Sequence, residues 1–134
     1  MAVLTRKQLK FLDRLFFEAP ALEKAVAELR AEAAAAAEQS VDPTGREAVV
    51  NIAPVKAALI YDDPEAWLQV VSMTWARYHP NTDIGKAMRR RYRLHETPER
   101  TSAMIPVGLE TYYRWRKEFL IVCALYAATK KLKY

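Results

Sequence analysis

Glycine is scarce in this chain: 3 of its 134 residues are glycine, whereas alanine is abundant. Helices favour alanine, and folds built from many short strands need glycine in their turns. Two segments, Asp63-Pro64 and Thr97-Pro98, also place a capping residue before a proline, which suits the first position of a helix. The sequence therefore predicts an all-α fold, with an N-terminal helical hairpin or arm followed by a C-terminal helix-turn-helix bundle.

Residues 1–40 are expected to form the N-terminal helical arm. Thr5 suits an N-cap, and an apolar stripe at helical spacing follows it. Because a proline disfavours helix at the residue before it, this helix should end or kink at Ala19, before Pro20. A second helix can begin at Pro20 and either fold back as a hairpin or dimerise. The two apolar stripes are formed by Leu9, Leu12, Leu15 and Phe16, and by Leu22, Val26 and Leu29.

The rest of the chain divides into a linker and a second helical region. Residues 41–61 are expected to be a linker with a short helix, since Ser, Asp, Pro and Gly favour turns at 39–45. Residues 62–134 are expected to be a helical domain that carries the function. Its helices should begin at Pro64, near Ile84, after Thr97 and near Leu109, and the helix-turn-helix should occupy about 97–131.

Charge is divided unequally along the chain. Residues 1–76 contain eight Lys/Arg and eleven Asp/Glu, a net charge of −3, and residues 77–134 contain thirteen and five, a net charge of +8. A basic half beside a mildly acidic half is the electrostatic pattern expected of a nucleic-acid-binding protein. A basic surface that is only solvated would have the same pattern.

The segment VGLETYYRWRK at 107–117 has the features of a recognition helix. A helix-turn-helix needs a short helix, a tight turn and a second helix whose N-terminal residues reach the major groove. Spacing places Val107, Tyr112, Trp115, Phe119 and Leu120 inward. Glu110, Tyr113 and Arg114 are then candidates for reading bases, and Thr111 faces outward with them. Candidates for phosphate contacts are Arg116, Lys117 and the arginine-rich segment Arg89, Arg90, Arg91 and Arg93. Consecutive arginines on a helix point in different directions, so some of these must be simply solvated.

Four motifs in this chain resemble the RinA/ArpU-type phage transcriptional regulators. They are TYYRWRKEFL after Val107-Gly108, RLFFEAPALEKAVAELRAE at 14–32, VDPTGREAV at 41–49 and AMRRRYR at 87–93. The resemblance implies a DNA-binding end similar to the fourth region of bacterial sigma factors, and regulation of phage or prophage late genes. It places Leu109, Glu110, Tyr113 and Arg114 at the groove and Tyr112 and Trp115 in the core.

Two departures from that family pattern concern the helix-turn-helix itself. Gly108 stands at the cap position where Ser or Thr is usual, which costs only a few tenths of a kcal/mol. Pro106 lies in the turn, and polar Thr101 and Ser102 lie where the first helix is usually apolar.

Other classes of protein fit the sequence poorly. His79, His95 and the single Cys123 have no metal-ligand spacing, and no phosphate loop or catalytic triad pattern occurs, so we expect no enzyme, no metal and no cofactor. With no apolar run long enough for a membrane and no signal peptide, we expect a cytoplasmic protein of a bacterial host. The expected partner is double-stranded DNA, while the arm would self-associate as a homodimer or contact RNA polymerase. The alternatives are a DNA-packaging protein resembling a small terminase subunit, and a structural helical interaction module.

Overall fold

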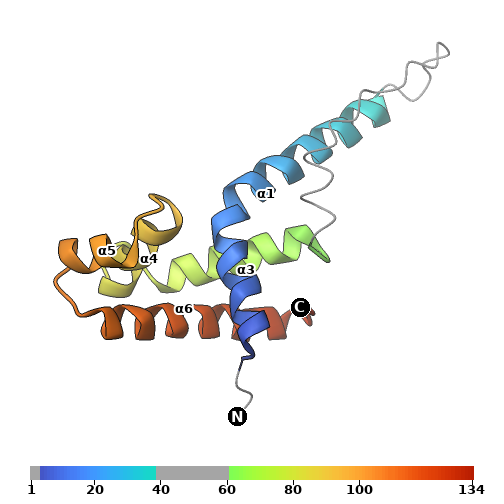
Figure 1. Ribbon diagram of the computed structural model, residues 1–134. Helices are drawn as coiled ribbons and strands as arrows, with labels where there is room; N and C mark the ends of the chain where they lie inside the picture. The colour runs from blue at the N-terminus through green and yellow to red at the C-terminus, as the bar shows by residue number, and fades with distance from the viewer. Residues whose placement is uncertain (1–3, 39–60) are drawn as a thin grey trace.

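The computed structural model describes residues 4–38 and 61–134, and these ranges contain five helices and no strand (Figure 1). The predicted all-α fold is therefore confirmed. The short helix expected at 41–61 and the VDPTGREAV motif lie outside the described residues, except for Tyr61. The helices are α1 (Arg6–Glu38), α3 (Pro64–Arg77), α4 (Asp83–Tyr92), α5 (Pro98–Met104) and α6 (Leu109–Thr129).

Side-chain caps fix where four of the helices begin. Thr5 and Gln8 form a reciprocal capping box at α1, with Gln8 N donating to Thr5 Oγ1 at 3.1 Å and Thr5 N to Gln8 Oε1 at 3.0 Å. Asp63, Thr82 and Thr97 accept hydrogen bonds from the first turns of α3, α4 and α5. These starts agree with the predicted ones, because a cap followed by proline or a short polar run is a local signal.

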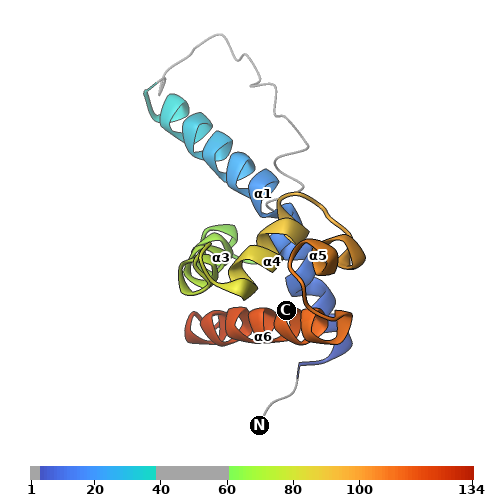
Figure 2. The same cartoon turned by 90° about the vertical axis from the view of Figure 1, so that its left-hand side faces the viewer.

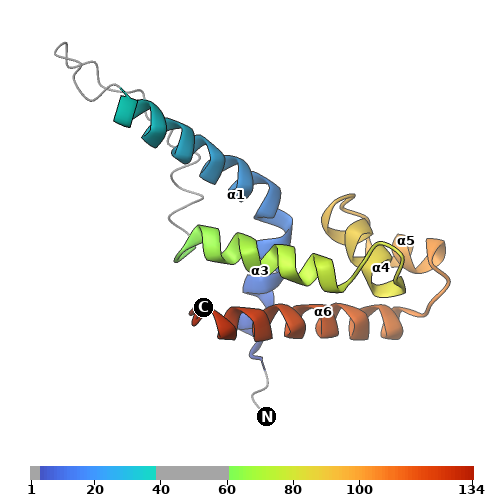
Figure 3. The same ribbon diagram turned by 180° about the vertical axis from the view of Figure 1, so that it is seen from behind.

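One long helix, and not a helical hairpin, forms the N-terminal region. α1 continues through Pro20 instead of ending before it, and the helix is bent along its course (Figure 1). Its first half lies inside the fold: Leu12, Leu15, Leu22 and Val26 are buried, whereas none of residues 27–36 is buried. Residues up to Val26 therefore belong to the core, and only the C-terminal part of α1 projects as an arm (Figures 2 and 3).

The core lies where α1 crosses the antiparallel pair α3 and α6 (Figures 1 and 3). At its centre, the Phe119 ring lies 4.7 Å from Phe16, 5.0 Å from Trp75 and 5.9 Å from Tyr92, measured between ring centroids. Such aromatic pairs stabilise a core beyond the area that they bury. A titratable residue is enclosed with them: burial raises the pKa of the Cys123 thiol to about 12, so it is a thiol and not a thiolate at neutral pH.

The described helices also bear on the membrane expectation. None of them combines the length and the apolar character that crossing a bilayer requires.

Candidate nucleic-acid interface

α5, residues 105–108 and the first half of α6 occupy the segment in which the sequence predicts a helix-turn-helix. α4 and α5 both pack against the N-terminal part of α6 (Figures 1 and 3). Ser102 fixes the turn, because its hydroxyl donates a hydrogen bond to the carbonyl of Val107, while the Val107 N–H lies 3.4 Å from the Ser102 carbonyl. A serine at this position thus has a structural role that an apolar residue could not fill.

The N-terminal half of α6 divides into a buried face and an exposed face. Tyr112 and Phe119 are fully buried, and Trp115 is half-buried. On the opposite side, an exposed face follows the i, i+3, i+4, i+7 spacing of a helix. It consists of Glu110, Tyr113, Arg114 and Lys117, with Leu109 exposed beside it and Thr111 half-buried at its edge. We call these first four residues the α6 face.

Thr101, on α5, is fully buried, and among the described residues its hydroxyl has no hydrogen-bond partner. An unsatisfied buried hydroxyl costs free energy. We expect Thr101→Val to raise the free energy of unfolding by on the order of 1 kcal/mol in urea denaturation. Thr74→Val is the matched control, because the Thr74 hydroxyl donates to the Val70 carbonyl at 2.8 Å. That control should lower stability, and a loss of stability on Thr101→Val would contradict the expectation.

The arginine-rich segment of α4 is mostly engaged inside the protein. Arg89 donates to the carbonyls of Tyr78 at 2.7 Å and Gly85 at 3.1 Å. Arg90 Nη1 lies 3.0 Å from both carboxylate oxygens of Glu96. These two arginines hold the α3–α4 and α4–α5 connections, a role that the order of residues did not indicate.

Asp13 on α1 binds arginines from two other helices. Arg91 approaches it in a bidentate pair, with Nε 3.1 Å from Oδ1 and Nη2 3.0 Å from Oδ2, and Arg116 Nε lies 3.2 Å from Oδ1. The Tyr92 hydroxyl donates to the same carboxylate at 2.6 Å, and Arg91 Nη1 also lies 3.3 Å from the Tyr112 hydroxyl. We call these five residues the Asp13 cluster. The cluster joins α1, α4 and α6.

The residues of the Asp13 cluster determine how readily Asp13 ionises. Burial disfavours its charged form, but the hydrogen bonds from Arg91, Tyr92 and Arg116 outweigh burial and hold the pKa of Asp13 below its ordinary value of 3.8. Burial and the Asp13 charge raise the pKa of the Tyr92 hydroxyl, which therefore keeps its proton. Arg91 and Arg116 are thus structural partners of an anion, and their guanidinium groups are already occupied.

Of the predicted phosphate-binding residues, Arg93 and Lys117 are the exposed ones. Arg93 lies over the Trp75 ring, 5.0 Å from its centroid, and makes no salt bridge within the described ranges. Lys86 on α4 was not among the predicted contacts. It is exposed beside the turn, and lines a hollow with Ile105 and Pro106. Its proximity to the turn depends on how α4 packs, so no local signal could have indicated it.

Comparisons with known proteins do not assign the chain to a family. No family model matches it, and neither a curated protein nor a solved structure shows significant similarity. The resemblance to the RinA/ArpU-type regulators therefore rests on the motifs quoted above.

Proposed function

We propose that this protein is a sequence-specific DNA-binding regulator of transcription in the cytoplasm of a bacterium, controlling phage or prophage genes. The observation that carries the proposal is the α6 face. It places a planar guanidinium, a phenol, a carboxylate and an ammonium side by side in the N-terminal half of α6, the expected recognition helix. The phage context comes from the motif resemblance alone.

The chemistry of the α6 face suits duplex DNA. Tyr113 has 47% of its surface exposed, and neither Arg114 nor Lys117 makes a salt bridge within the described parts of the chain. An arginine can read guanine through paired hydrogen bonds, whereas a lysine acts on phosphates as a point charge. Behind this face, buried Tyr112 receives a hydrogen bond from Arg91, which fixes the rotation of α6 about its axis. The buried side of α6 therefore positions the helix, and its exposed side is the one that would contact DNA.

The proposal predicts different effects for Arg114→Ala and Lys117→Ala. A preferred duplex would first be selected from a random library and then compared with a scrambled duplex by fluorescence anisotropy. Arg114→Ala should reduce the preference for the selected duplex by about 1–3 kcal/mol, because a bidentate base contact is lost. Lys117→Ala should weaken both duplexes alike and lower the slope of log affinity against log salt by about 1.

Lys133→Ala is the matched control, because Lys133 is an exposed lysine beyond the C-terminal end of α6. This variant should leave the preference for the selected duplex over the scrambled duplex unchanged. An unchanged preference in Arg114→Ala would disprove the role given to the α6 face, and failure of the wild-type protein to select any duplex at low salt would disprove the function.

A further inference from the structure

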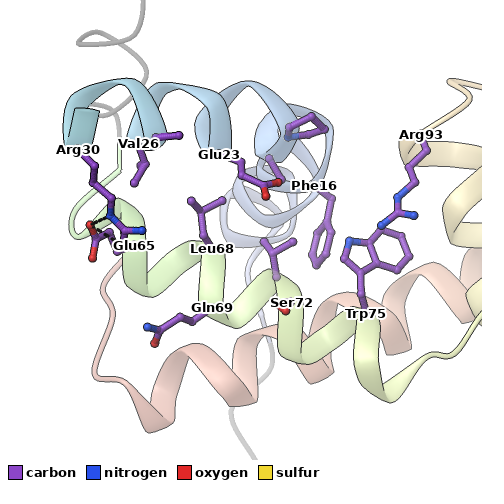
Figure 4. A pocket seen from close by; sticks show the side chains of 14 residues that line it. Phe16, Glu23, Val26, Arg30, Glu65, Leu68, Gln69, Ser72, Trp75 and Arg93 are labelled. Carbon is purple, nitrogen blue, oxygen red and sulfur yellow. Dashed lines mark hydrogen bonds and ion pairs between the residues drawn. The ribbon is translucent and has the colours of Figure 1, made fainter. Parts of the chain in front are cut away.

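A groove of about 570 Å³ lies between α1 and α3 (Figure 4). Its apolar lining includes Phe16, Val26, Leu68 and Trp75. One end is closed by the salt bridge between Arg30 and Glu65, at 2.9 Å, and Arg93 lies over Trp75 at the other end (Figure 4). The groove is therefore an elongated apolar surface with charges at its ends, the form that receives an amphipathic helix.

The helix that forms one wall of this groove extends beyond the core. α1 continues past the buried Val26 as far as Glu38, and none of residues 27–36 is buried. At a rise of about 1.5 Å per residue, this part of the helix is about 18 Å long. Residues 31–36 are all exposed, and the helix leaves the other helices in Figures 2 and 3. A helix of this length is marginal in water without packing against a neighbour.

We propose that the groove receives the projecting part of α1 from a second copy of this protein, in a reciprocal, two-fold symmetric dimer. In such a dimer each copy supplies one helix and one groove, so every contact is made twice. The alanines of the incoming helix allow a close approach to the apolar lining. The projecting part of α1, which has no neighbour within its own copy, would thus fill the groove of the other copy.

Charge favours an antiparallel arrangement of the two α1 helices. Running antiparallel, the incoming helix brings its acidic C-terminal part to the end of the groove where Arg93 lies. Glu32 is exposed on that part of α1, and no salt bridge in the described ranges engages it or Arg93. We therefore assign Glu32 of each copy as the partner of Arg93 of the other.

Formation of the dimer does not require DNA binding. In the proposed regulator, the dimer would supply two recognition helices for a target with two half-sites. It is tested without DNA, by sedimentation equilibrium over micromolar to millimolar concentrations. The wild-type protein should show a reversible equilibrium between monomer and dimer. Ala27→Arg, at an exposed residue lining the groove, should raise the dimer dissociation constant about tenfold or more, because a charged side chain would occupy the apolar contact. Ala128→Arg, at an exposed residue of α6, is the matched control and should leave it unchanged.

A charge exchange tests the antiparallel pairing. Arg93→Glu and Glu32→Arg should each weaken the dimer, and the double variant should recover most of the lost affinity, because the opposite charges meet again. A chain that stays monomeric at every concentration, an assembly of more than two copies, or equal effects of Ala27→Arg and Ala128→Arg would each overturn the proposal. A double variant as weak as the singles would overturn the pairing. None of these results depends on whether Arg114→Ala changes sequence preference.

Discussion

Gly85→Ala is expected to lower the free energy of unfolding by about 3 kcal/mol or more, beyond the usual cost of one added methyl group in a core. A Cβ at Gly85 would lie 2.2 Å from the His79 carbonyl oxygen and 2.6 Å from that of Tyr78. Both are backbone atoms and cannot move aside like the end of a side chain. The free-energy cost of this clash should exceed the stabilisation of up to about 1 kcal/mol that a change from glycine to alanine normally brings inside a helix.

The clash would also separate α4 from the end of α3. Arg89 joins them by donating to the Tyr78 carbonyl, so displacement of α4 would break that hydrogen bond as well. Gly108→Ser is the matched control, because a Cβ at Gly108 meets no atom within 4 Å. Gly108 is in an extended conformation open to any residue. A serine cap there should add a few tenths of a kcal/mol. Chemical denaturation measures both variants, and a Gly85→Ala protein as stable as the wild type would refute the close packing.

Asp13→Ala is expected to cost up to about 3 kcal/mol of stability, since it leaves two partly buried arginines without their anion. The Arg91 side chain retains only 15% of its exposure, and that of Arg116 retains 26%. The double variant Asp13→Ala/Arg91→Ala should recover part of the loss, because no unpaired charge then remains at Arg91. Glu65→Ala is the control. It breaks the ion pair with Arg30, in which both side chains are mostly exposed, and it should have little measurable effect.

Asp13 also predicts how stability depends on pH. Its pKa in the folded protein lies below the ordinary value of 3.8, so the unfolded chain takes up the proton first as the pH falls. Its contribution is therefore complete above about pH 4, and is lost as the pH falls below 3.8 through the folded-state pKa. Urea denaturation of wild type and Asp13→Ala should show a stability difference that narrows below about pH 4. A difference that stayed constant down to about pH 2 would show that the charge of Asp13 does not contribute.

Local signals in the sequence determined the helices and the exposed side of α6. Thr5, Asp63 and Thr97 cap their helices because a cap needs only the next turn of its own chain. The buried and exposed sides of α6 follow from the helical period, which is equally local. The course of α1 through Pro20 could not be read in this way. A proline can bend a helix instead of ending it when buried contacts on both sides hold the helix together.

Only the tertiary structure decided what each arginine does. In the sequence, the arginines from 89 to 93 and Arg116 appear as equivalent basic residues, and nothing there says which bind phosphates and which are simply solvated. In the fold, Asp13 lies 78 positions from Arg91 and 103 from Arg116 along the chain, and its carboxylate is hydrogen-bonded to both. No sequence period links residues that far apart, because their distance is set by how α1 crosses α4 and α6. The sequence by itself thus determined that the C-terminal half is basic and helical, and the packing of α1 determined which of its charges remain free for a partner.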